Sequence, residues 1–136
     1  EKADNNGCTP LIHAAERGQV DMVRLLLKSR ADMEKADNNG WTPFLHVAAE
    51  GQLEAARVLA ELGADMEKAD NDGCTAFTHA AALHQLDMLR LLVELRADME
   101  KADSGGHTVS DHAAAACHLD VLPLLDESQT KGMRNL

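Results

Sequence analysis

The sequence predicts an α-rich repeat protein, a solenoid built from stacked helix-turn-helix pairs. Three observations predict it. The heptad Ala-Asp-Met-Glu-Lys-Ala-Asp recurs every 33 residues, at 31–37, 64–70 and 97–103. A turn-forming tetrad begins at the last residue of each copy, and two short apolar-periodic segments follow it. Because such constant spacing indicates a repeated structural unit, we divide the single domain, 1–136, into repeats 1–33, 34–66, 67–99 and 100–136.

Each repeat is predicted to open with a tight turn. Asp-Asn-Asn-Gly occupies 4–7 and 37–40, and Asp-Asn-Asp-Gly occupies 70–73. Asn, Asp and Gly tolerate the positive φ angles that tight turns require. The three tetrads therefore predict three equivalent turns, one near the start of each of the first three repeats.

A short first helix is expected directly after the turn, over roughly 10–17 in the first repeat. Thr9-Pro10 and Thr42-Pro43 suit the N-cap and first helical positions. The Thr hydroxyl can accept a hydrogen bond from a backbone N–H that has no partner in the first turn. Pro suits the next position because it has no N–H that would be left without a partner. Gly18 and Gly51 are expected to end these helices in a left-handed conformation.

A second helix is expected over roughly 20–29. Val20, Val23, Leu26 and Leu27 recur there at helical spacing on one face. Helices this short are marginal alone in water, so neighbouring repeats must stabilise them by stacking.

These motifs together resemble the ankyrin repeat. The resemblance rests on Gly7-x-Thr9-Pro10-Leu11-x-x-Ala14-Ala15, Gly18-Gln19, Val23, Leu25-Leu26-Leu27 and Ala31-Asp32, and on the period that repeats them along the chain. The resemblance implies an ankyrin-type solenoid whose loops are β-hairpin fingers. It also implies a concave face, formed by the fingers and the first helices, that binds another protein, and it implies no catalytic activity.

Several positions depart from that pattern. The family's His stands one place later here, at 13, 46, 79 and 112. Helix-ending glycines become His84 and Cys117, and the Gly before Ala-Asp becomes Arg30 and Arg96. A left-handed backbone at these side chains costs ~1 kcal/mol each. Ser110, Asp111 and Pro123 make the last repeat a degenerate C-terminal cap.

Composition excludes several classes of protein. Lys and Arg total 13 against 23 Asp and Glu, a net charge of −10 that disfavours nucleic-acid binding. No apolar run is long enough to cross a bilayer, and no signal-peptide pattern is present. Three cysteines do not make a disulfide framework, and Cys8 and Cys74 fall two repeats apart. We expect an intracellular, cytoplasmic monomer without membrane contact.

The recurring histidines are the strongest hint of chemistry. Layers of packed helices lie ~8–10 Å apart, so neighbouring rings cannot share one ion at ~2.0–2.1 Å from each nitrogen. We favour rings that pack near the helix start and hydrogen-bond to backbone. A pH-sensitive stack and a metal site are the alternatives.

Cys117 and His118 could be mistaken for a catalytic Cys–His pair, but no Gly-rich turn nearby could bind an oxyanion. We expect no catalytic residue, no metal-ligand cluster and no cofactor.

The partner-binding surface is expected on the finger tips and on the exposed side of the first helices. Trp41, the single Trp, stands at a finger position, where it either anchors a partner or stiffens neighbouring fingers. Leu83 would add an apolar patch with Ala82, Ala115 and Ala116. The candidate contact residues are Trp41, Leu83, Glu50, Arg17, Cys74, His107, Asn38, Asn39, Asn71 and Asp72.

The sequence therefore predicts a non-enzymatic module that binds a partner protein with an apolar anchor and some basic residues. A second interpretation is a regulatory or structural excerpt of a larger protein, because the first repeat opens inside a predicted hairpin. A third is an engineered, consensus-like repeat protein, which the near-identical hairpins favour and Arg30, His84, Cys117 and Pro123 disfavour. An enzyme using the histidines or Cys117 ranks last.

Overall fold

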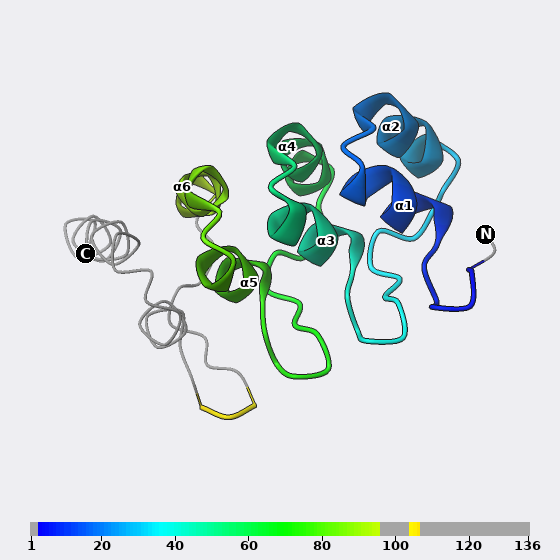
Figure 1. The fold of residues 1–136 in the computed structure, drawn as a ribbon. Helices are drawn as coiled ribbons and strands as arrows, with labels where there is room; N and C mark the ends of the chain where they lie inside the picture. Colours follow the sequence, from blue (N-terminus) through cyan, green and yellow to red (C-terminus); the bar gives the residue numbers. More distant parts are fainter. Residues whose placement is uncertain (1–2, 96–103, 107–136) are drawn as a thin grey trace.

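The computed structural model describes residues 3–95 and 104–106, which include three helix pairs (Figure 1). The pairs are α1 (Pro10–Glu16) with α2 (Val20–Lys28), α3 (Pro43–Glu50) with α4 (Leu53–Glu61), and α5 (Ala76–Ala82) with α6 (Leu86–Glu94). Apart from residues 104–106, the fourth repeat lies outside the described residues. That places His107, His112, Ala115, Ala116, Cys117 and Pro123 outside them as well.

Local signals set the helix ends as expected. The Oγ1 atoms of Thr9, Thr42 and Thr75 accept hydrogen bonds from backbone N–H groups three residues later, at the first turns of α1, α3 and α5. Gly18 and Gly51 are left-handed, with φ of 69° and 70°. The same conformation persists where side chains replace glycine: Arg30 has φ of 68° and His84 has φ of 57°. The predicted strain is therefore present at both positions.

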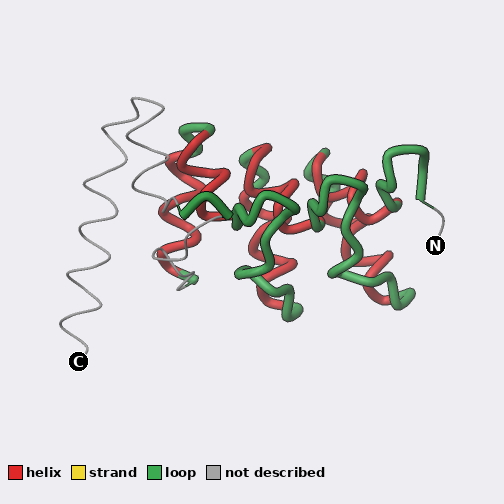
Figure 2. The backbone as a smooth tube through the Cα atoms, turned by 90° about the horizontal axis from the view of Figure 1, so that it is seen from below, coloured by secondary structure: helices red, strands yellow, loops and turns green. Residues whose placement is uncertain are grey.

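The helices form two layers. α1, α3 and α5 contact one another in succession, and α2, α4 and α6 pack behind them (Figure 1). Seen from below, the helix pairs lie side by side along the stack (Figure 2). The core between the layers is continuous from repeat to repeat and is made of aliphatic side chains and two phenylalanines. Its largest members are Phe44, Phe77, Leu11, Ile12, Leu45, Leu59, Met88, Leu89 and Leu92.

The loops that extend from the α1, α3 and α5 layer are turns, and the structure assigns no strand to the described residues. The expected β-hairpins are therefore not shown in these parts. In the second loop, Gly40 N–H donates to Asp37 O and Asp37 N–H donates to Trp41 O, which closes the turn without extending it into a ladder. Each loop meets its neighbour through one backbone hydrogen bond, such as Asn38 N–H to Asn6 O at 3.0 Å.

Two glutamines join successive repeats at the ends of the first helices. Gln52 Nε2 donates to Glu16 O at 3.0 Å, and Gln85 Nε2 donates to Ala49 O at 2.9 Å. Gly18 makes room for Gln52, because a Cβ at Gly18 would overlap the Gln52 amide.

Within the described ranges, no helix has the length and apolar character that a membrane span requires.

Candidate partner-binding surface

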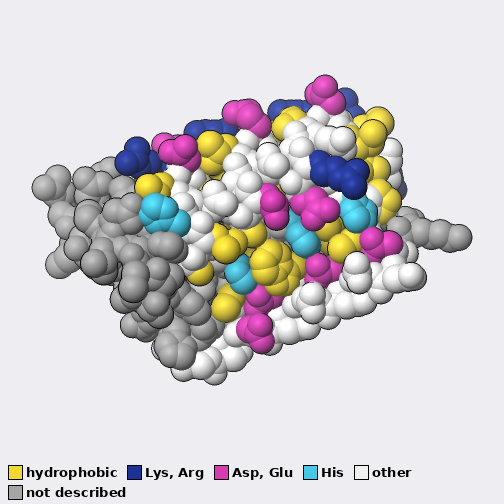
Figure 3. All heavy atoms as spheres, in the orientation of Figure 1, with side chains coloured by type: hydrophobic (Ala, Val, Ile, Leu, Met, Phe, Trp, Pro, Cys, Tyr) yellow, Lys and Arg dark blue, Asp and Glu magenta, His cyan; other side chains and the backbone are white. Residues whose placement is uncertain are grey.

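The loops and first helices present one continuous surface, which we call the front face. It consists of the turns 4–8, 37–41 and 70–74, the helices α1, α3 and α5, and the residues Arg17 and Leu83 that directly follow α1 and α5. Figure 3 shows imidazoles, carboxylates and apolar side chains mixed across this face, while most Lys and Arg side chains gather toward the α2, α4 and α6 edge. This is the surface on which the partner contacts were expected.

A histidine–aspartate pair recurs in each described repeat. His13 Nε2 lies 2.9 Å from Asp4 Oδ2, and the equivalent pairs His46–Asp37 and His79–Asp70 measure 3.0 and 2.7 Å. The expectation that these rings hydrogen-bond to backbone is wrong. The reason is that each turn places an aspartate carboxylate directly over the first helix, where it is a stronger partner for an imidazole than a carbonyl.

The same aspartates organise the turns. Asp37 Oδ1 accepts hydrogen bonds from the N–H groups of Asn39 and Trp41 at 2.9 and 3.0 Å, while its Oδ2 meets His46. One carboxylate thus fixes the loop and ties it to the helix that follows. This arrangement makes the front face a pre-formed surface.

Trp41 lies between two of these imidazoles. Its ring centroid is 5.2 Å from that of His46 in its own repeat and 4.3 Å from that of His79 in the next repeat. The indole is half-buried and packs against the core. Trp41 therefore stiffens the junction of two repeats, which was one of the two expected roles, and it still presents part of its surface on the front face.

Glu16 and Cys8 stand at the junction of the first two repeats. Glu16 Oε1 lies 3.2 Å from His13 Nδ1, and Glu16 Oε2 lies 3.6 Å from His46 Nδ1. Burial raises the pKa of the Cys8 thiol, and the nearby charges of Asp4, Asp37 and Glu16 raise it further. The pKa of the Asp4 carboxyl is lowered, chiefly by the hydrogen bond from Cys8 N–H and next by that from His13.

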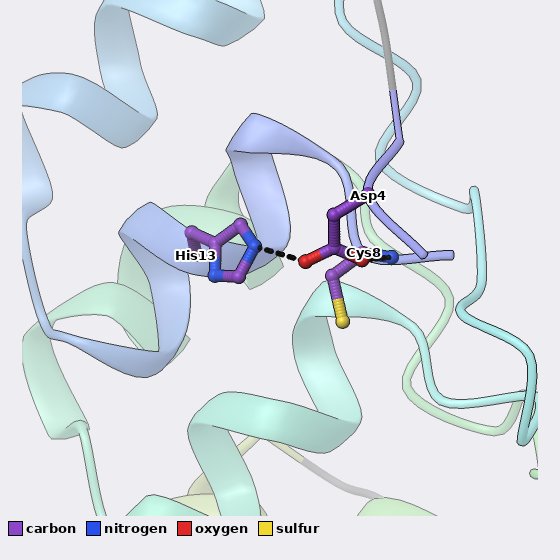
Figure 4. A group of neighbouring side chains, drawn as sticks. All are labelled: Asp4, Cys8 and His13. Carbon is purple, nitrogen blue, oxygen red and sulfur yellow. Dashed lines mark hydrogen bonds and ion pairs between the residues drawn. The ribbon is translucent and has the colours of Figure 1, made fainter. Parts of the chain in front are cut away.

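The structure brings potential metal ligands together, although the sequence analysis expected no such cluster. Three groups have ligand atoms within 4.8 Å of one another: Asp4, Cys8 and His13; Cys8, Asp37 and His46; and Asp70, Cys74 and His79. Figure 4 shows the first group, with His13 facing Asp4 and the Cys8 sulfur beside them. Each group contains one histidine with an aspartate and a cysteine, so it does not require histidines of different repeats to share an ion.

The candidate contact residues within the described ranges lie on the front face. Leu83 is 52% exposed. Trp41 and Cys74 are half-buried. His107 lies outside the described residues, as do two of the alanines expected beside Leu83. The exposed polar and charged members are Arg17, Asn38, Asn39, Glu50, Asn71 and Asp72.

The front face is acidic. Over the turns 4–8, 37–41 and 70–74 and helices α1, α3 and α5, the side chains include six carboxylates and, at the end of α1, one arginine. Asp37 and Asp70 are largely buried beneath their histidines, at 7% and 3% side-chain exposure, so the remaining four form the accessible charge. The carboxylates are Asp4, Glu16, Asp37, Glu50, Asp70 and Asp72.

Two features of this surface escaped the sequence analysis, although the sequence contains a signal for each. The Asp–His pairs follow a constant nine-residue spacing, as in Asp4 and His13. The inter-repeat glutamines recur at one repeat position, as in Gln52 and Gln85. The aspartate that recurs nine residues before each of these histidines is the signal for the Asp–His pairs.

Comparison with known proteins agrees with this architecture. The family model described as ankyrin repeats (3 copies) matches residues 1–70. A search of curated proteins gave no match. The matched region covers the first two helix pairs and their turns, in which the same capping threonines, turn aspartates and left-handed glycines recur. The chain therefore belongs to the ankyrin repeat family.

Proposed function

We propose that the front face binds a partner protein through a segment that carries an apolar anchor flanked by basic residues. Ankyrin repeats are generally protein-interaction modules, and this chain shares their helical stack. The observation that supports the proposal most is the combination of exposed Leu83 and half-exposed Trp41 with an excess of carboxylates on one pre-formed surface.

Leu83 and Trp41 supply the apolar contact. A partner that covers an exposed leucine removes apolar area from water. Each Å² of apolar area buried in this way stabilises the complex by roughly 25 cal/mol. An indole clamped between His46 and His79 has little side-chain entropy left to lose on binding. Both features favour an anchor that docks beside these residues.

The accessible carboxylates supply the electrostatic preference. Asp4, Glu16, Glu50 and Asp72 line the front face, and Arg17 is the single Lys or Arg among its described residues. A negative surface attracts basic partners, speeds their association and disfavours acidic ones. The partner segment is therefore expected to be basic around its anchor.

The chemistry of the face favours binding over catalysis. A thiol with a raised pKa, such as that of Cys8, stays protonated and is a poor nucleophile. The ring nitrogens of His13 both face carboxylates, so the ring is not aimed at a substrate. The ankyrin family is typically non-enzymatic, which also favours binding over catalysis.

A capture experiment tests the proposal. Three proteins are immobilised: the unaltered chain, a double variant with Trp41→Ala and Leu83→Glu, and a Leu62→Glu control. Each is exposed to lysate of the source cells, and the proteins that it retains are identified by mass spectrometry. Leu62 is 48% exposed but follows α4 in the other layer, so it controls for adding a charge at an exposed leucine. A protein retained by the chain and the control but lost from the front-face variant supports the proposal. Equal capture by all three folded chains contradicts it.

A further inference from the structure

We propose that Asp4, Cys8 and His13 form a binding site for a divalent transition-metal ion of the zinc type. The site lies on the front face, and the proposal does not rest on partner binding there. It is built within one repeat, from the first turn and the helix α1 that follows it (Figure 4). The donors are a carboxylate oxygen, a thiolate sulfur and an imidazole nitrogen, the three ligand types that zinc accepts in proteins.

The geometry is close to that of a coordination shell. Zinc lies ~2.3 Å from sulfur and ~2.0–2.2 Å from nitrogen and oxygen, so its ligand atoms stand roughly 3–4 Å from one another. His13 Nε2 and Asp4 Oδ2 are already 2.9 Å apart, and all three ligand atoms lie within 4.8 Å of one another. A side-chain adjustment of the order of 1 Å brings the set around one ion.

Glu16 prepares His13 for this role. Its Oε1 lies 3.2 Å from His13 Nδ1, close enough to accept the N–H of that nitrogen once Nε2 exchanges its contact with Asp4 for a metal ion. A carboxylate on the far nitrogen of a metal-ligating histidine is the usual outer-shell partner, because it fixes the ring and its tautomer. Likewise, the turn N–H groups of Asn6 and Cys8 hold Asp4 through Oδ1 and leave Oδ2 for the ion.

The surrounding charge favours a cation. Asp4 Oδ2 and Glu16 Oε1 lie 2.9 and 3.2 Å from the ring nitrogens of His13, and Asp37 belongs to the neighbouring ligand group that shares Cys8, so a cation here faces several carboxylates. On binding, the sulfur coordinates the ion and the thiol proton passes to solvent. Asp4 and His13 side chains are 43% and 37% exposed, which gives the ion a path in and leaves a fourth position for water.

The other two ligand groups lack part of this arrangement. His46 Nδ1 is 3.6 Å from Glu16 Oε2, beyond hydrogen-bond distance, so this ring lacks the carboxylate contact that His13 makes through Nδ1. In the third repeat, Ala82 stands where the first has Glu16, and the indole of Trp41 covers His79. These differences assign the ion to the group in the first repeat.

Cobalt titration tests the site with the full chain under reducing conditions. In a Cys74→Ser, Cys117→Ser background, Cys8 is the only thiol. We expect one equivalent of Co²⁺ to produce thiolate-to-cobalt charge-transfer absorption that Zn²⁺ displaces, and Zn²⁺ to raise the melting temperature. Adding Cys8→Ser to that background, with unchanged far-ultraviolet circular dichroism, should abolish both effects.

Further substitutions in that background identify the ligands. We expect His13→Gln to abolish the absorption, Glu16→Gln to weaken Zn²⁺ binding about 10–100-fold, and His46→Gln to leave binding unchanged. The absence of charge-transfer absorption in the background chain would overturn the proposal. So would metal binding that persists without Cys8, or binding that depends on His46 and not on His13.

Discussion

At the residue scale, Asp70 shows how one side chain connects a turn to a helix. Its Oδ1 accepts hydrogen bonds from the N–H groups of Asp72 and Cys74 at 2.9 and 3.0 Å, and its Oδ2 lies 2.7 Å from His79 Nε2. The side chain is 3% exposed, so water cannot replace these contacts. Charged hydrogen bonds of this kind contribute more to stability than neutral ones.

Replacing this carboxylate should therefore be costly. We expect Asp70→Ala to lower the free energy of unfolding by about 1–3 kcal/mol, because two turn N–H groups and an imidazole lose their partner. Urea denaturation followed by circular dichroism measures the change. Asp72→Asn is the control: Asp72 is exposed, repeat two has Asn39 at that position, and the expected change is below ~0.5 kcal/mol. Equal effects of the two substitutions would contradict this account.

Arg30 illustrates backbone strain. Its φ is 68°, whereas the equivalent position in the second repeat is Gly63. We expect Arg30→Gly to raise the free energy of unfolding by about 0.5–1 kcal/mol, because glycine adopts this conformation without steric cost. Chemical denaturation again provides the measurement. Lys28→Gly, in the last turn of α2, should lower stability by a similar amount. A loss of stability in Arg30→Gly would show that the side chain's contacts outweigh the strain.

The sequence predicts some of these residue-level features and not others. The left-handed conformation of Arg30 could be predicted, because a glycine of the next repeat marks the same position. The Asp37–His46 contact was missed, because it joins two elements nine residues apart whose relative placement depends on the turn geometry. Local conformation follows from local residues, whereas pairing between elements depends on packing.

At the scale of the elements, the helices follow closely from their sequences. Helices expected over roughly 10–17 and 20–29 are observed as Pro10–Glu16 and Val20–Lys28. Capping threonines, an N-terminal proline and apolar periodicity are all local signals, so they predict where these helices begin and end, while stacking stabilises them. The expected β-hairpins came from the resemblance alone, and the described loops have too few backbone pairs to form strands.

Gln52 joins elements of different repeats, and its removal tests the stacking. We expect Gln52→Ala to lower the free energy of unfolding by about 0.5–1.5 kcal/mol, because its Nε2 no longer donates to Glu16 O. Gln19→Ala is a matched control. Gln19 also precedes a second helix but is exposed in the first repeat, so a change below ~0.5 kcal/mol is expected. Equal losses of stability in the two variants, measured by thermal or urea unfolding, would mean that the hydrogen bond between the repeats does not stabilise the fold.

At the scale of the whole molecule, the repeats align their loops and first helices into one acidic, pre-formed face. The exposure of Leu83 could be predicted from helix periodicity, since it ends the outward side of α5. The packing of Trp41 on His79 could not, because the two residues belong to different repeats and meet only through stacking. The ligand group of Asp4, Cys8 and His13 arises in the same way, from a turn folded back over a helix.

The affinity of a captured partner for the Leu83→Glu chain tests the central claim most directly. Isothermal titration calorimetry should show at least a tenfold loss relative to the unaltered chain, about 1.4 kcal/mol, because a charge replaces the apolar contact. The Leu62→Glu chain, altered at an equally exposed leucine beside α4, should bind unchanged. Unchanged affinity in Leu83→Glu, or the same loss in Leu62→Glu, would contradict a binding site on the front face.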